Sequence, residues 1–231
     1  MKQINGFLIS RQWRESNDGL LLRYWLNTEE GPLLVEQTSQ EGIFFVEQPH
    51  LNQALNLIKN HYHRSRTLAL KSFSQHPVCG FYFTSQKNLR AAAKILKEHN
   101  IPPLEADIRT VDRYLMERFI TSTMSVTDVL ASGSHVAPNT QHRHIYNAKL
   151  KPIDFTPNFR VVSFDIETNY LDNSLLSIAV YDDATELVFI VGSSSEVKCL
   201  SFIDERSLLV AFIRWIQEYD PDLLIGWNCI N

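Results

Sequence analysis

Cysteine is scarce in this sequence: there are three in 231 residues, and Cys79, Cys199 and Cys229 lie far apart. An odd and widely spaced set excludes a disulfide framework and suggests no zinc knuckle. No apolar run approaches the length of a membrane span, and the N-terminus lacks the apolar core of a signal peptide. These absences predict a cytoplasmic protein with no membrane partner.

Charge of one sign is not in large excess, because the net charge is only −4. The two signs are nevertheless unevenly distributed. From Phe159 onward, four Lys or Arg face twelve Asp or Glu, a net charge of −8 that leaves +4 for the residues before it. An acidic part fits a metal site, and a mildly basic part is compatible with a polyanion. The split favours two domains, which the length also allows, but it identifies no ligand.

The stretch 160–168 predicts a buried β-strand that carries two carboxylates. Asp165 and Glu167 are two apart, so on a strand they share one face. Two carboxylates about 6–7 Å apart repel each other and resist burial, unless a cation lies between them. Mg²⁺ and Mn²⁺ suit such oxygen ligands. The alternative is a surface strand with two solvated acids. The prediction of burial depends on the apolar residues of the run: Val161, Val162, Phe164 and Ile166.

The part before this stretch predicts a sheet-rich domain. Residues 6–46 alternate strand-like runs with polar turns, which indicates a small barrel or curled sheet. Apolar spacing predicts helices over 51–58 and 85–99. A strand over 78–83, the second helix and a strand over 104–108 would resemble half of a ferredoxin-like or RNA-recognition fold. Further predictions are a strand at 67–70, a helix at 111–120 and strands at 124–130 and 144–150.

The aromatic run Phe81, Tyr82 and Phe83 precedes a helix with an outer row of basic residues. Such a pair of elements can stack on bases, as in a non-catalytic module that binds single-stranded nucleic acid. The alternative is that Phe81 and Phe83 point into the core and Tyr82 points out. No glycine-rich recognition strand accompanies the run, which favours the core interpretation.

The acidic part predicts a mixed sheet of a particular order. After the strand at 160–168, strands at 175–181 and 186–191 follow through short turns, which indicates antiparallel pairing. A helix then begins at Asp204 or Ser207, and Asp220-Pro221 ends it. A buried strand at 222–228 follows, and a helical crossover suits parallel pairing with an earlier strand. This order is the opening of a ribonuclease-H-like sheet. The apolar helix face is predicted to be Leu208, Leu209, Phe212, Ile213 and Ile216.

Three segments together resemble family B DNA polymerases, the bacterial ones in particular. Residues 164–168, Phe-Asp-Ile-Glu-Thr, resemble the first exonuclease motif of that family. Residues 219–228 resemble the run into its second motif, Asn-x-x-x-Phe-Asp, and 105–120 resemble the segment that precedes the exonuclease. The resemblance implies an α+β fold with a mixed-β N-terminal domain over 1–152. It also implies an incomplete ribonuclease-H-like exonuclease domain over 153–231, after a proline-containing linker.

What the resemblance implies for function is a proofreading 3′→5′ exonuclease of a DNA-directed DNA polymerase, acting in replication and repair. Asp165 and Glu167 would be the catalytic ligands of Mg²⁺ (or Mn²⁺), with two ions in the complete site. Thr168 and Asn228 would contact the DNA substrate, although Asn228 has the alternative role of bonding a local turn. The implied partners are the primer 3′ end and the template strand, and a sliding clamp through parts outside this sequence.

The sequence departs from the family pattern at its end. It stops at Asn231, before the Phe-Asp of the second motif, and the third exonuclease motif and the polymerisation motifs are absent. We therefore expect an N-terminal part of a larger polymerase that is inactive by itself. A free-standing exonuclease with four acidic ligands is a second enzymatic hypothesis. It would require a further Asp and a third motif after Asn228.

Overall fold

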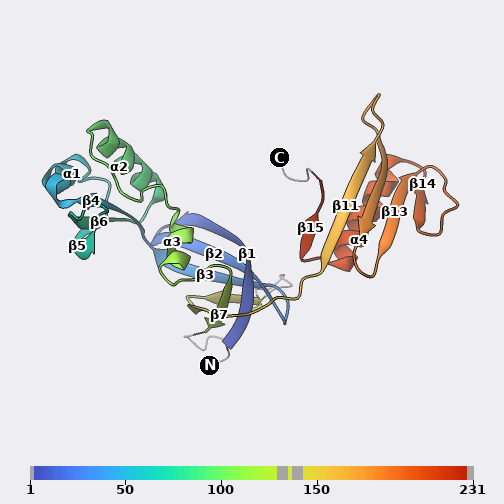
Figure 1. Ribbon diagram of the computed structural model, residues 1–231, viewed down its shortest axis with the longest axis horizontal. Coiled ribbons are helices and arrows are strands. Elements are labelled where there is room, and N and C mark those ends of the chain that lie inside the picture. Colours follow the sequence, from blue (N-terminus) through green and yellow to red (C-terminus); the bar gives the residue numbers. More distant parts are fainter. Residues whose placement is uncertain (1–2, 129–134, 137–142, 228–231) are drawn as a thin grey trace. The chain divides into compact units, whose positions relative to one another are not determined.

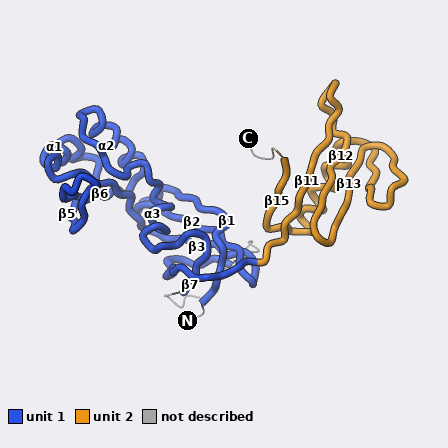
Figure 2. Tube along the Cα trace, in the orientation of Figure 1, with its two compact units in different colours: residues 1–157 blue, residues 158–231 orange. Residues whose placement is uncertain are grey.

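The computed structural model describes residues 3–128, 135–136 and 143–227 (Figure 1). The chain divides into two compact units, Met1–Pro157 and Asn158–Asn231 (Figure 2). Each unit has hydrophobic core clusters of its own, two in the first and one in the second. Over the described ranges, no helix is long and apolar enough to cross a membrane.

A seven-stranded sheet forms the larger part of unit 1, in the order β10-β7-β1-β2-β3-β9-β8. Its centre is the antiparallel meander β1–β3, which confirms the predicted strands and turns up to residue 40. The last strand of the predicted run, β4 (Gly42–Glu47), belongs to the smaller sheet instead. The alternating side chains Leu20, Leu22, Tyr24 and Leu26 of β2 are at most 1% exposed, so the core lies on this face. The strands are β1 (Gln3–Ser16), β2 (Gly19–Thr28), β3 (Leu33–Gln40), β7 (Thr123–Thr127), β8 (His135–Val136), β9 (Arg143–Tyr146) and β10 (Lys149–Pro152).

A smaller antiparallel sheet of three strands, in the order β4-β6-β5, forms the rest of unit 1 with two helices. The helix α2 begins after Ser85, whose hydroxyl accepts from the Asn88 N–H at 3.3 Å. Its buried Leu89 and Leu96 share a core cluster with Phe81 and Phe83 of β6. The elements are β4 (Gly42–Glu47), a 3₁₀ turn (Gln48–His50), α1 (Leu51–Leu57), β5 (Arg64–Lys71), β6 (Pro77–Phe83) and α2 (Gln86–Glu98).

The strand predicted at 104–108 is wrong, and with it the strand–helix–strand half of a ferredoxin-like fold. Only one bridge forms there, between Phe45 and Leu104. Pro102-Pro103 can donate no ladder hydrogen bonds, and Glu105 turns the chain away with a φ of 59°. Both edges of β6 are already paired, one with β4 and one with β5. The segment therefore touches the outer edge of β4 at a single point.

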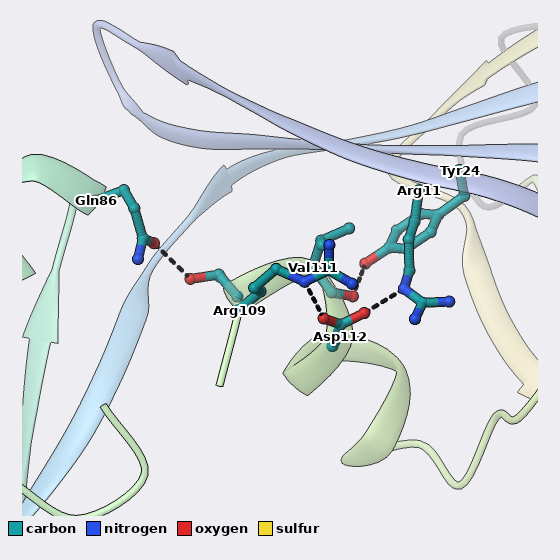
Figure 3. A network of polar contacts seen from close by, with 7 residues as sticks. Arg11, Tyr24, Gln86, Arg109, Val111 and Asp112 are labelled. Carbon is teal, nitrogen blue, oxygen red and sulfur yellow. Dashed lines mark hydrogen bonds and ion pairs between the residues drawn. The ribbon is translucent and has the colours of Figure 1, made fainter. Parts of the chain in front are cut away.

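A short helix, α3 (Thr110–Met116), joins the two sheets of unit 1 (Figure 3). The Tyr24 hydroxyl of β2 donates to the Val111 carbonyl at 2.9 Å, and burial raises the pKa of Tyr24 above its ordinary value. Asp112 pairs with Arg11 of β1 and, at 2.5 Å, with Arg109. On the other side, Thr110 donates to Gln86 of α2 at 3.2 Å. The helix is shorter than the predicted 111–120.

Unit 2 is a five-stranded mixed sheet in the order β14-β13-β12-β11-β15. The pairs β11–β12 and β12–β13 are antiparallel, as the short turns predict. The pair β11–β15 is parallel, as the helical crossover predicts, and β14 was not predicted. The predicted burial of the strand at 222–228 is wrong, because β15 is only three residues long and none of them is buried. The elements are β11 (Val161–Thr168), β12 (Leu175–Tyr181), β13 (Glu186–Val191), β14 (Cys199–Phe202), α4 (Glu205–Tyr219) and β15 (Leu223–Ile225).

The helix α4 covers one face of this sheet, but not with the predicted residues alone. Asp204 caps its start, with the Ser207 N–H donating to Oδ1 at 2.7 Å. Leu209 and Ile213 belong to the predicted apolar face, yet both are exposed. The packing residues on the helix are Leu208, Ala211, Phe212, Trp215 and Tyr219. Two overlapping apolar stripes run along this helix, and the aromatic one packs on the sheet.

Candidate active site

Asp165 and Glu167 lie on the face of the sheet that α4 leaves uncovered. Val162 and Phe164 belong to the core cluster that includes α4, and the rings of Phe164 and Phe212 are 6.3 Å apart. Residues 163–167 pair with β12 without interruption, so side chains alternate regularly between the two faces. The two carboxylates therefore share the face opposite the helix.

The prediction that this strand is buried is wrong for its second half. Val162 is fully buried, but Asp165, Glu167 and Thr168 are exposed and Ile166 is 48% exposed. The physical reason is the extent of the neighbouring elements. The strand β15 pairs only with the first three residues of β11, and the second half has β12 alone beside it among the described strands.

Exposure changes the energetic argument for a metal. Two unit charges about 6–7 Å apart in water repel by only about 0.6 kcal/mol, which a fold tolerates without any cation between them. The case for a metal therefore depends on the chemistry of the donors. Carboxylate oxygens on an open face are the ligands that Mg²⁺ and Mn²⁺ prefer, and Mg²⁺ commonly keeps water and substrate phosphate in its remaining positions.

Both carboxylates are available for such an ion. Among the described residues, neither Asp165 nor Glu167 makes a salt bridge or a side-chain hydrogen bond, so no arginine or lysine occupies them. Within the same residues, no group of three or more His, Cys, Asp or Glu side chains is placed to hold a metal. The pair fits part of a divalent-metal site, which water, substrate or further ligands would complete.

Thr168 ends β11 at an irregularity. Glu167 pairs with Ser177 but Thr168 pairs with Leu175, so the register shifts between them. A tight turn follows, in which the Asn169 N–H donates to the Ser174 carbonyl at 2.8 Å. Thr168 is exposed and follows Glu167 directly in the chain, past this shift in register. The fourth predicted site residue, Asn228, lies outside the described residues.

The sequence interpretation missed a close contact beside the pair. A Cβ atom on Gly226 would lie 2.6 Å from the Phe164 carbonyl oxygen. Any residue with a side chain would clash there, so the position requires glycine. Glycine at the end of a strand run often marks such an approach of two backbones, so the signal was present in the sequence. It allows the chain after β15 to pass directly against the residue that precedes Asp165.

Comparison with known families assigns each part of the chain. The model of the DNA polymerase family B exonuclease domain matches residues 103–231. The chain belongs to this family. Two more specific models, the N-terminal domain and the insertion domain of DNA polymerase II, match residues 6–41 and 42–101. The chain thus carries the N-terminal and exonuclease regions of a family B polymerase of the polymerase II kind.

Individual relatives agree with this assignment. The chain is 34% identical to DNA polymerase II of Escherichia coli (strain K12) over 234 residues, which is 98% of this chain and 28% of that protein. The chain therefore spans little more than a quarter of its relative. Its fold is similar to that of the family B DNA polymerase from the hyperthermophilic archaeon Pyrobaculum calidifontis. The TM-score is 0.71, at 16% identity over 97% of this chain and 30% of the other.

Proposed function

We propose that this chain is the N-terminal portion of a DNA-directed DNA polymerase and contributes to its 3′→5′ proofreading exonuclease, in DNA replication and repair. The observation that carries the proposal is the pair Asp165 and Glu167. The two acids lie on an uncovered sheet face, without a cationic partner among the described residues, inside the segment that matches the exonuclease domain.

The proposed organisation has an N-terminal domain over 1–152 and the first part of a ribonuclease-H-like exonuclease domain over 153–231. Support for the second comes from the order of its elements. Three antiparallel strands come first, with the acids on the first of them, then the edge strand β14, a helix on one face and a strand parallel to the first. Such a layout leaves the other sheet face open to a nucleic-acid strand.

In the proposed mechanism, Asp165 and Glu167 hold Mg²⁺ or Mn²⁺ through their carboxylate oxygens, with two ions in the complete site. Ions bound there would supply a nucleophilic hydroxide and stabilise the leaving 3′ oxygen during phosphodiester hydrolysis. The open face lets a terminal phosphodiester of the primer strand approach both side chains. Thr168, exposed beside them, contacts the terminal nucleotide, and Asn228 contacts the substrate through its amide.

Two carboxylates make a weak cage. Oxygen-ligand sites for divalent ions usually have six or more donors, and few of these come from this pair. We therefore expect the chain by itself to bind metal poorly and to turn over DNA negligibly. For the whole polymerase we also propose that it binds the template strand, that it is cytoplasmic and that it contacts a sliding clamp through other parts of the protein.

The experiment that tests the proposed function uses the full-length gene product with Asp165→Ala and Glu167→Ala combined. Degradation of single-stranded DNA should be abolished while nucleotide incorporation stays intact, because the two acids belong to the exonuclease site alone. Both activities are measured on the same preparation. Loss of both, or of neither, would contradict the roles given to the two acids.

The alternative, a non-catalytic module for single-stranded nucleic acid, has less support. Phe81 and Phe83 are fully buried, which confirms the core interpretation of the aromatic run. Tyr82 is half-buried under the Arg64 guanidinium, 3.6 Å from the ring centre, so it offers no free stacking face on that side. Titration of this chain with Mn²⁺ separates the hypotheses. Weak binding that Asp165→Ala removes supports the exonuclease, whereas DNA binding unaffected by that change supports the module.

A further inference from the structure

The beginning of β15 is fastened to the beginning of β11 by a set of polar contacts. The Arg160 N–H donates to Asp222 Oδ2 at 2.9 Å. In return, the N–H groups of Asp222 and Leu223 donate to the Arg160 carbonyl oxygen at 2.9 and 3.2 Å. The Arg160 guanidinium also donates to the Tyr219 carbonyl at 3.0 Å, which ties the end of α4 to the same point. We call Arg160 and Asp222 with these bonds the strand latch.

The strand β15 has little else to fix its position. It is three residues long, lies at the edge of the sheet and pairs in parallel, which is slightly less stable per residue than antiparallel pairing. Leu224 and Ile225 are about half exposed, at 47% and 50%, so apolar burial contributes little. Register is strongly specified where one face of a strand is buried, and no residue of β15 is buried. A one-residue slip would send every side chain to the other face.

The two ends of β15 are constrained in different ways. At its beginning the latch sets which residue of β15 faces which residue of β11. Just past its end, the missing Cβ of Gly226 permits contact with the Phe164 carbonyl. The contact at the beginning depends on a side-chain oxygen, because Asp222 Oδ2 is the acceptor of the Arg160 N–H. The ion pair from Arg160 to Asp220 contributes less, since Asp220 is 81% exposed and the two atoms are 3.3 Å apart.

We propose that Arg160 and Asp222 are positioning residues of the exonuclease site, an inference that rests on the function proposed above. By holding β15 in one register on β11, the latch fixes where Gly226, the residue after β15, lies against Phe164, the residue before Asp165. A slip of one residue would displace Gly226 along β11 by about 3.3 Å. A misplacement of only about 1 Å around a reacting centre can cost about a hundredfold in rate.

The test uses the full-length gene product with Asp222→Ala, Asp222→Asn and Arg160→Gln. Asparagine keeps an oxygen that accepts the Arg160 N–H, whereas alanine removes it. Asp183→Ala, at an exposed residue of the turn between β12 and β13, is the matched control for loss of one negative charge. Degradation of single-stranded DNA is measured over a range of Mg²⁺ concentrations, and nucleotide incorporation is measured on each preparation.

We expect Asp222→Ala to lower the exonuclease rate about 10–100-fold and to raise the Mg²⁺ concentration needed for half-maximal rate, as for residues that orient metal ligands. Asp222→Asn should restore most of the rate, and Arg160→Gln, which keeps the backbone N–H, should lose only a few-fold. Incorporation should be unchanged in every variant, and Asp183→Ala should equal the unmodified protein in both assays.

Three results would overturn the positioning role: an unchanged Mg²⁺ dependence in Asp222→Ala, equal losses in Asp222→Ala and Asp222→Asn, or a parallel loss of incorporation. The last would indicate a general folding role. An Asp165→Ala arm separates this inference from the proposed function. If Asp165→Ala abolishes degradation while Asp222→Ala does not affect it, only the positioning role fails. If Asp165→Ala leaves degradation intact, the exonuclease assignment itself fails.

Discussion

Strands β2 and β11 both lie inside a sheet with a strand on either side, yet their side chains have very different surroundings. Along β2, four alternating residues from Leu20 to Leu26 are at most 1% exposed. Along β11, exposure rises from zero at Val162 to 48% at Ile166. The neighbours of β2 run along nearly its whole length, whereas β15 accompanies only the first three residues of β11. An inner position in a sheet therefore does not ensure burial.

The difference has an energetic meaning. Burying a side chain such as Leu contributes about 1.5–3 kcal/mol to folding, so a charged residue on the core face of β2 would be severely destabilising. The exposed half of β11 contributes little of this kind. Because like-charge repulsion there is only about 0.6 kcal/mol, two acids are tolerated in that half at small cost. The strand β2 therefore contributes to stability through burial, whereas the exposed half of β11 carries the acids of the proposed exonuclease site.

The largest expected effect contrasts the two strands directly. Leu22→Ala should lower the free energy of unfolding of unit 1 by about 2–5 kcal/mol, because it opens a cavity in a fully buried core. Ile166→Ala, which removes the same number of carbon atoms but from a half-exposed position, should lower that of unit 2 by less than about 1.5 kcal/mol. Amide hydrogen exchange of β2 and β11 reports the two units separately. Equal losses of protection in the two variants would remove the distinction.

A smaller effect is expected from Tyr24→Phe, which removes the hydroxyl that donates to Val111. The cost should be about 0.5–1.5 kcal/mol at neutral pH. Burial raises the pKa of Tyr24 in the folded state above its ordinary 10.0, so the unfolded chain loses this proton first. The hydroxyl's contribution is complete below pH 10.0 and is lost as the pH rises above that value.

Denaturant unfolding of unit 1 on both sides of that pH checks this prediction. The unmodified protein should lose more stability than Tyr24→Phe when the pH is raised. Burial also raises the pKa of Tyr114. Part of the loss of stability with rising pH should therefore remain in both proteins. If stability fell equally with pH in the two proteins, the prediction that the unfolded chain loses the Tyr24 proton before the folded protein does would be wrong.

The smallest expected effect concerns the candidate site itself. Asp165→Ala with Glu167→Ala should change the free energy of unfolding of unit 2 by no more than about 0.5 kcal/mol without metal, since both acids are exposed. Added Mn²⁺ should stabilise the unmodified unit slightly and the double variant not at all. Thermal unfolding with and without Mn²⁺ measures both quantities. A large loss of stability without metal would mean that the acids have structural partners.

The helix α4 illustrates how far sequence reasoning extends. Its existence, its start at Asp204 and its end at Asp220 are determined locally, by a capping box and by a left-handed residue before Pro221. The face that packs was not predictable in the same way. Both the row with Leu209 and Ile213 and the row with Trp215 and Tyr219 are apolar, and periodicity alone gives them similar weight. Contact between Trp215 and Phe189 of β13 selected the second row.

The candidate site shows a similar limit. The spacing of Asp165 and Glu167 placed them on one face, because side-chain alternation is a property of any strand. Their exposure was not predictable, because the same apolar neighbours suit a covered strand and an uncovered one. The approach of Gly226 and the latch at Asp222 join residues about 60 positions apart, and no local pattern specifies such a pairing.

The amino-acid sequence by itself determined most of the strands and helices in their order, but not β14 and not the absence of a strand at 104–108. It also determined the shared face of the two acids and the resemblance to family B polymerases. These features depend on local propensity, on alternation and on short motifs, which are all read along the chain. The tertiary structure alone decided which half of β11 is covered, which side of α4 packs and what holds β15 in register. The reason is that burial and register are relations between distant segments, and their free energy exists only once those segments meet.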